Sequence, residues 1–393
     1  MNRNSRLVAA GLCQQTGSVV KIGGEQLLTR PYKTAATEPG CDAQASGLKK
    51  AKVQQHLSAI SDEDFKPSTS GDYCHFRIPT SIVSVCSVSE SQKPVSVVKW
   101  NTKESDLLLS CSYDNDVKLW KYQDTKMILR RKWSAPASVT CGGWLSGSEA
   151  KFAMGCFDRS LSIFDVNSNS DVCLQKLPHT DPVNGLFANC TNSNLIFSAA
   201  QNCVNLWDVR IASNCGPVQT YADKVNYAIQ SLTVLQSGLE LAVSTDYVAK
   251  NSPQKSILIW DIRKPIILSD QIYQDHFVCS HLAVHPILPV FATQTAGDYI
   301  TLIRSKAPYK VLKQRRFEQH STGSFRTEFI FSPDGNFVIS GSADGQLFVY
   351  DYKTRVCKKR IFLSDSPVIS IDHGWNNMIA TGSWNGFVTV VCN

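Results

Sequence analysis

The stretch FRTEFIFSPDGNFVISGSADGQLFVYDYKTRVCKKRI, residues 325–361, decides the fold of this 393-residue chain. It contains four short apolar runs separated by turn residues, among them Ser-Pro-Asp-Gly at 332–335 and Asp-Gly at 344–345. Short apolar runs bounded by such residues predict strands, and tight turns between them predict antiparallel pairing. The stretch therefore predicts a four-stranded antiparallel sheet whose two apolar faces cannot be buried by the sheet alone.

The same unit recurs from about residue 80 to the end of the chain. The third predicted strand of each unit ends 41 to 53 residues after the previous one, at Trp120, Phe164, Trp207, Trp260, Ile303, Tyr350 and Val391. A period near 40 to 45 residues with four strands per repeat is typical of β-propeller blades. Seven repeats predict a closed ring, because each twisted sheet covers the apolar face of the next.

The two ends of the repeat region predict how the ring closes. The chain stops two residues after Val391, so the seventh repeat has only three strands. The run SIVSVC at residues 81–86 is expected to supply the missing outer strand, since an unpaired edge would invite aggregation. Residues 1–72 are polar and weakly periodic, which predicts a flexible tail. The fold class is thus all-β: a monomeric seven-bladed propeller over 73–393 with a disordered N-terminal tail.

Composition and cysteine spacing argue against a membrane protein and against a metal-binding protein. Apolar residues make up 43% of the chain and charged residues 19%, and the net charge is +7. No apolar run approaches the roughly 18 residues that cross a bilayer, which argues against a membrane protein. The 14 cysteines never stand closer than 12 positions apart, so no C-x-x-C pair exists to bind a metal. We therefore expect reduced core cysteines in an intracellular protein, with no metal and no cofactor.

Several short motifs carry a family resemblance. Trp-Asp pairs end the third strands at 207–208 and 260–261, Pro178-His179 stands where Gly-His is usual, and second turns contain Asp114, Asp158 and Asp344. With these motifs the chain resembles WD40 β-propellers. Residues 240–352 are most similar to the branch of that family containing WD repeat-containing protein 25 and pre-mRNA-processing factor 17. The resemblance implies an inner His, Asp, Ser/Thr and Trp network, but no blade here has all four, so packing is expected to contribute more.

No catalytic motif is present: the chain lacks G-x-S-x-G, H-E-x-x-H, Walker A and G-x-G-x-x-G patterns. The turn aspartates stand where a carboxylate caps backbone N–H groups. We therefore expect no enzyme. A propeller hydrolase with paired carboxylates at the channel mouth is the alternative.

The residue before each turn aspartate or asparagine predicts a binding surface. Tyr113, Phe157 and Trp384 occupy this position in blades one, two and seven, which become neighbours once the ring closes. Aromatic residues are enriched among interface hot spots. The sequence predicts that these three rings form an exposed partner-binding arc, although each ring could instead fold onto its own blade.

Two further motifs suggest other contacts. Trp-Asp-x-Arg occurs at 207–210 and 260–263, and resembles the motif by which some WD40 proteins dock on the DDB-type adaptor of cullin-4 ubiquitin ligases through an arginine, here Arg210 and Arg263. A basic rim is predicted on the outer strands of blades five and six. It consists of Lys310, Lys313, Arg315, Arg316, Lys358, Lys359 and Arg360. Such charges either protect an exposed edge or attract RNA or an acidic peptide.

We expect a non-catalytic scaffold that holds several protein partners. The family resemblance implies a nuclear ribonucleoprotein assembly for pre-mRNA processing, with direct RNA contact left open. A substrate receptor of a cullin-4 ubiquitin ligase is the alternative binding function.

Overall fold

The computed structural model describes residues 92–146, 150–168, 172–188, 194–212, 215–223, 227–246, 256–270, 272, 277–374 and 377–392, together with the backbone of 84–89. The predicted tail over 1–72 lies outside these residues. The chain divides into two units, 1–60 and 61–393, and the second contains every described element.

The second unit contains 28 strands among its described residues. In chain order they are β1 Ser84–Ser89, β2 Val95–Trp100, β3 Leu107–Ser112, β4 Asp116–Gln123, β5 Lys126–Ser134, β6 Val139–Trp144, β7 Lys151–Cys156, β8 Ser160–Asp165, β9 Gln175–Pro178, β10 Gly185–Ala188, β11 Leu195–Ala199, β12 Cys203–Asp208, β13 Gln219–Ala222, β14 Ile229–Val234, β15 Glu240–Thr245, β16 Ile257–Asp261, β17 Ile267–Ser269, β18 Cys279–Val284, β19 Val290–Thr295, β20 Tyr299–Arg304, β21 Val311–Phe317, β22 Phe329–Phe331, β23 Phe337–Gly341, β24 Gln346–Asp351, β25 Cys357–Phe362, β26 Val368–His373, β27 Ile379–Ser383 and β28 Phe387–Cys392.

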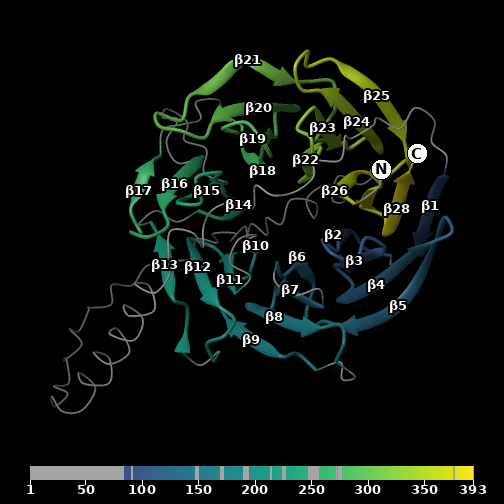
Figure 1. Cartoon of the computed structure of the whole chain (residues 1–393), viewed down its shortest axis with the longest axis horizontal. Coiled ribbons are helices and arrows are strands. Elements are labelled where there is room, and N and C mark those ends of the chain that lie inside the picture. The colour runs from purple at the N-terminus through teal and green to yellow at the C-terminus, as the bar shows by residue number, and fades with distance from the viewer. Residues whose placement is uncertain are drawn as a thin grey trace, which may run out of the picture. The chain divides into compact units, whose positions relative to one another are not determined.

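These strands form seven four-stranded antiparallel sheets, which is the predicted all-β seven-bladed propeller (Figure 1). Blades one to six take consecutive groups of four strands from β2–β5 to β22–β25. The first strand of each blade lies against the first strand of the next, and β26 of blade seven returns to β2. The sheets therefore surround a central channel that these inner strands line.

Blade seven contains strands from both ends of the unit. Its order is β1-β28-β27-β26, and β1 pairs with β28 over six residues, from Ser84 opposite Cys392 to Ser89 opposite Phe387. The described strand includes residues 84–86 of the expected 81–86 and continues to Ser89, and residues 81–83 lie outside the described part of the chain. This pairing covers the edge that β28 would otherwise expose.

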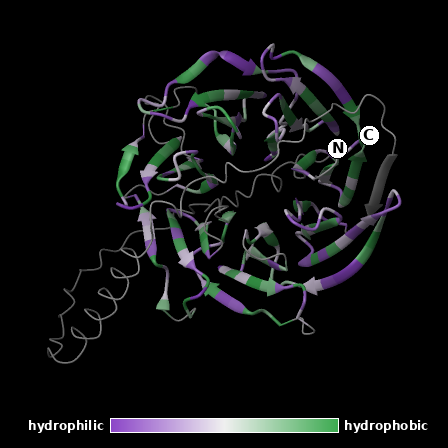
Figure 2. Cartoon of the chain, in the orientation of Figure 1, coloured by the Kyte–Doolittle hydropathy of each residue, from purple (hydrophilic) through white to green (hydrophobic). Residues whose placement is uncertain are grey.

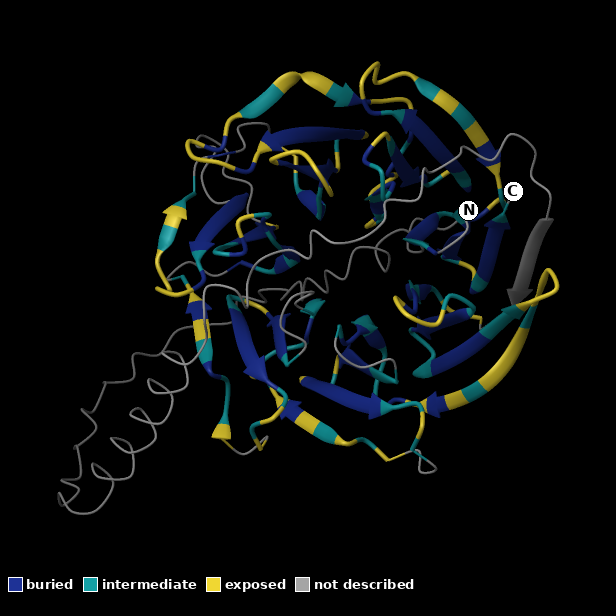
Figure 3. Cartoon of the chain, in the orientation of Figure 1, coloured by how far each residue is buried: buried dark blue, intermediate teal, exposed yellow. Residues whose placement is uncertain are grey.

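The core lies between neighbouring blades. Middle strands such as β3 are buried on both faces, whereas outer strands such as β5 are largely exposed (Figure 3). Hydrophilic residues gather on the outer strands (Figure 2). Between blades one and two, the buried rings of Trp133 and Phe152 meet edge to face with centroids 5.1 Å apart. Because each blade needs its neighbour for burial, the ring is stable only when closed.

Partial hydrogen-bond networks accompany this packing. In blade three the Trp207 indole donates to Ser198 Oγ at 2.8 Å, and His179 Nε2 lies 2.7 Å from the same oxygen. In blade six His320 Nδ1 lies 2.9 Å from the Tyr350 hydroxyl, so tyrosine occupies the tryptophan position within a buried network. The inner network of His, Asp, Ser/Thr and Trp that the resemblance implies is therefore only partly formed in these two blades.

Candidate partner-binding surfaces

The upper face of the propeller, defined here as the face with the turns between second and third strands, contains the aromatic arc Tyr113, Phe157 and Trp384. The turn geometry repeats from blade to blade. The backbone N–H of Tyr113 donates to Pro94 O at 3.0 Å, that of Phe157 to Ser138 O at 3.0 Å and that of Trp384 to Pro367 O at 2.9 Å. The third turn residue has positive φ in each case, at Asn115, Arg159 and Gly386.

The same position holds a small residue in other blades. Alanine occupies it in blades five and six, where Ala296 donates to Val278 O at 2.9 Å and Ala343 to Ser321 O at 2.7 Å. The turn therefore does not require a large ring. Moreover, the turns of blades one and two are linked, because Ser138 Oγ donates to Tyr113 O at 2.8 Å.

The three rings differ in exposure. Phe157 is 51% exposed, whereas Tyr113 and Trp384 are half-buried. The Trp384 ring packs edge to face on Phe325, with centroids 5.0 Å apart. Burial raises the pKa of the Tyr113 phenol, and the charge of Arg326 acts against that shift. The expectation of three exposed rings is thus correct in full only for Phe157.

Phe325 and Arg326 were missed by the sequence analysis. Both residues stand at the head of the 325–361 unit, for which the sequence predicts no start of the first strand. The structure begins β22 only at Phe329, so both residues belong to the connection between blades five and six. No local sequence signal distinguishes the connection from the strand.

Asp158 and Asp344 cap their own turns, whereas Asp114 accepts from Gln92 N at 3.3 Å, outside its turn. Asp158 accepts from Ser160 N at 3.2 Å and from Ser160 Oγ at 2.6 Å, and pairs with Lys176 at 2.9 Å. Asp344 accepts from Gln346 N at 3.1 Å. These two carboxylates hold the turn backbone.

Charged side chains inside the channel join neighbouring blades. Lys99 Nζ lies 3.8 Å from both Glu328 Oε2 and Asp372 Oδ1. Asp372 also accepts from Trp100 N at 2.7 Å, and Glu328 from Ile371 N at 3.2 Å, so these contacts connect blades one, six and seven. Burial raises the pKa of Asp372 despite the nearby Lys99 charge. The hydrogen bonds to strand backbone indicate a structural role.

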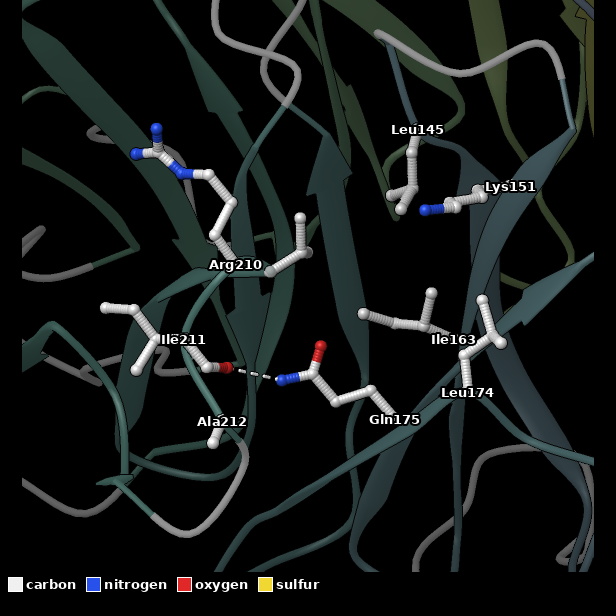
Figure 4. Close-up of a pocket in the computed structure, with 9 residues that line it drawn as sticks. Leu145, Lys151, Ile163, Leu174, Gln175, Arg210, Ile211 and Ala212 are labelled. Atoms are coloured by element: carbon white, nitrogen blue, oxygen red, sulfur yellow. Dashed lines mark hydrogen bonds between the residues drawn. The ribbon is translucent and has the colours of Figure 1, made fainter.

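Both Trp-Asp-x-Arg arginines are exposed, and each donates its backbone N–H to the aspartate of its own motif. Arg210 donates from Nη2 to Asp208 Oδ2 at 2.6 Å and from Nε to Asp208 Oδ1 at 3.0 Å. Arg210 lines a pocket of about 490 Å³ together with Leu145 and Ile163, and its guanidinium points away from these two side chains (Figure 4). At the second motif, Asp261 Oδ1 accepts from the backbone N–H of Arg263 at 2.8 Å, and Arg263 is exposed.

The basic rim divides into two kinds of side chain. Arg316 lies over the Tyr299 ring at 4.3 Å, and Arg360 lies over the Phe348 ring at 5.3 Å. These two arginines pack on their own blades, which favours edge protection for them. Of the remaining rim residues, Lys359 is half-buried and the others are exposed, namely Lys310, Lys313, Arg315 and Lys358.

No group of three or more His, Cys, Asp or Glu side chains in the described part of the chain could hold a metal ion. The described part of the chain also contains no helix that is long and apolar enough to span a lipid bilayer.

Comparisons with known proteins agree with the fold. The family "WD domain, G-beta repeat" matches residues 82–121 and 312–351. The chain is 27% identical to WD repeat-containing protein 25 of Mus musculus over 302 residues, which are 76% of this chain and 55% of that protein. It is 22% identical to pre-mRNA-processing factor 17 of Homo sapiens over 311 residues, 75% of this chain and 50% of that one.

A third similarity is to "DDB1- and CUL4-associated factor 11 homolog" of Caenorhabditis elegans, with 26% identity over 253 residues, 62% of this chain and 41% of that protein. The chain thus spans about half the length of the curated relatives it matches. None of these comparisons indicates a catalytic family.

Proposed function

We propose that this WD40-repeat β-propeller is a non-catalytic scaffold that binds a protein partner through the aromatic arc of its upper face. WD40 repeats and the relatives support an interaction role. The observation that carries the proposal is the contrast between aromatic and alanine side chains at one repeated turn position. Since the turn forms equally well around Ala296 and Ala343, the rings of Tyr113, Phe157 and Trp384 serve something other than the turn.

We further propose that the partner belongs to a nuclear assembly for pre-mRNA processing. The similarity to pre-mRNA-processing factor 17 of Homo sapiens supports this assignment. The exposed lysines of the basic rim would then lie at the side of the disc, where they could approach RNA held by the assembly.

The test compares the full chain with a variant in which Tyr113, Phe157 and Trp384 are all replaced by alanine. The matched control is Phe362→Ala, since Phe362 is an aromatic residue 61% exposed on the outer strand β25. Affinity purification with mass spectrometry should recover pre-mRNA-processing proteins with the wild type and the control but lose them with the triple variant. Hot-spot truncations cost about 2 kcal/mol or more, roughly 30-fold in affinity. Retention of every partner by a folded triple variant would contradict the proposal.

A second candidate is a substrate receptor of a cullin-4 ubiquitin ligase. Its support is the similarity to "DDB1- and CUL4-associated factor 11 homolog" together with the exposed Arg263. Arg210 is exposed as well, and its guanidinium donates to Asp208 from Nε and Nη2. Arg263→Ala should abolish binding of purified DDB-type adaptor, whereas Lys264→Ala, at the exposed neighbouring cation, should not. Failure of the wild type to bind the adaptor would reject this candidate.

A further inference from the structure

The connection between blades five and six brings two different side chains to the upper face. Residues 318–328 link β21 to β22, and Gln319, Gly323 and Ser324 within this connection have positive φ. The connection turns so that Phe325 packs on Trp384 of blade seven, with ring centroids 5.0 Å apart. The next residue, Arg326, extends in another direction.

Arg326 reaches over the central channel. Its Nη1 donates to the backbone carbonyl of Asn184 at 3.1 Å, and Asn184 immediately precedes β10 of blade three. Blades six and three lie on opposite sides of the ring, so a bond between their inner ends must cross the channel opening (Figure 1). Arg326 is exposed, and its hydrogen-bond partner there is a neutral carbonyl.

Arg326 forms no ion pair among the described residues. The nearest carboxylate in sequence, Glu328, pairs with Lys99 at 3.8 Å deeper in the channel. An arginine presents five N–H donors in a planar fork, and the bond to Asn184 uses one of them. The fork therefore has donors available for an acceptor that enters from the upper face.

This cation lies beside the aromatic arc. Burial raises the pKa of the Tyr113 phenol, and the Arg326 charge opposes that increase. On another side, the residue before Arg326 contacts Trp384. Arg326 therefore lies between the channel mouth and the aromatic arc, and its neighbour Phe325 contacts the arc directly.

We propose that this surface binds a protein segment with an acidic side chain, whose carboxylate pairs with Arg326 while a neighbouring apolar residue packs on the Trp384 and Phe325 rings. Arginine and carboxylate form charge-assisted hydrogen bonds about twice as strong as neutral ones. An RNA backbone draws instead on several cations along a strand. At this surface the cation Arg326 directly follows Phe325, which packs on Trp384, and this arrangement suits a carboxylate next to an apolar residue. This inference rests on the proposed scaffold function and specifies the chemistry of its partner.

The experiment begins with a random 12-residue peptide library displayed on phage and selected on the purified full-length chain. The best peptide is synthesised with its acidic residue and, separately, with the corresponding amide. Dissociation constants are then measured by fluorescence anisotropy for wild type, Arg326→Met and Arg355→Met. Arg355 is the matched control, because it is also exposed and also donates Nη1 to a backbone carbonyl of another blade, that of Gln314.

We expect the selected peptides to contain Asp or Glu beside an apolar residue. Arg326→Met should weaken binding of the acidic peptide by about tenfold or more, as for other close charge pairs. The amide peptide should bind the wild type as weakly as the acidic peptide binds Arg326→Met. Its affinity should fall little further when Arg326 is replaced by Met. Arg355→Met should leave both constants unchanged. A melting temperature equal to wild type shows that the lost Asn184 contact has not altered the fold.

Three outcomes would overturn the inference. One is a library without acidic enrichment; a second is equal binding of acidic and amide peptides to the wild type. The third is binding of a 12-nucleotide single-stranded RNA, but of no peptide, that depends on Arg326. If the triple arc variant loses the peptide while Arg326→Met retains it, acid recognition is wrong and the scaffold proposal stands. If neither change affects the peptide, both proposals are wrong.

Discussion

Replacing Ser198 with alanine should destabilise blade three through the loss of one shared oxygen. Ser198 is fully buried, and its Oγ lies 2.8 Å from Trp207 Nε1 and 2.7 Å from His179 Nε2. His179 Nδ1 lies 3.2 Å from the Leu177 carbonyl, which can only accept, so Nδ1 carries the proton and Nε2 accepts from Ser198. The variant leaves both the indole N–H and the imidazole nitrogen without this partner.

The expected cost follows from burial. Each buried polar group left without a hydrogen bond costs about 1–3 kcal/mol. Trp207 is only 2% exposed and should show the full effect, whereas half-buried His179 can partly recover a bond to water. We therefore expect a loss of about 3 kcal/mol in the free energy of unfolding.

Ser110→Ala in blade one is the matched comparison. Ser110 is equally buried, but its Oγ accepts one side-chain hydrogen bond, from Trp120 Nε1 at 2.7 Å. Its loss should be about half as large, near 1.5 kcal/mol. Urea unfolding followed by far-UV circular dichroism measures both values. Equal losses for the two variants, or a loss below about 0.5 kcal/mol for Ser198→Ala, would refute the reasoning.

Two further predictions concern closure and pH. Deleting residues 1–90 removes β1 and exposes the edge of β28, so size-exclusion chromatography should show aggregation and the melting temperature should fall, whereas deleting 1–72 should change neither. Burial lowers the pKa of His320 from 6.5 to about 4, so between these values the unfolded chain binds a proton that the folded chain excludes. The free energy of unfolding therefore has its full value above pH 6.5 and falls by about 3 kcal/mol as the pH drops to 4. His320→Asn should make the free energy of unfolding depend less on pH between these two values. An unchanged slope would contradict the assignment to His320.

The blade architecture could be predicted because its signals are local. A strand, a tight turn rich in Asp, Asn and Gly, and the next strand follow one another within about 20 residues, and each pair of strands forms its own hydrogen bonds. The repeated third-strand ends from Trp120 to Val391 then give the number of blades. The turn position shared by Tyr113, Phe157 and Trp384 follows from the same register.

Exposure and side-chain direction depended on the tertiary structure. Trp384 is half-buried because Phe325, 59 positions earlier, turns onto it from the neighbouring connection. Arg316 and Arg360 count as rim charges in the sequence, but the rings of Tyr299 and Phe348 hold them against their blades. Likewise, the sequence places Arg210 in a docking motif, but only the structure shows that the buried Asp208 carboxylate pairs with its guanidinium.

The sequence by itself determined the repeat, the strand order within each blade and the positions of the turns. Only the closed ring decided which side chains meet across it: Arg326 contacts Asn184 from 142 positions away, and Lys99 of blade one meets Glu328 of blade six. The physical reason is the range of the interactions. Strand pairing within a blade joins neighbours in sequence, whereas contacts over the channel exist only after all seven blades have packed and brought distant inner strands together.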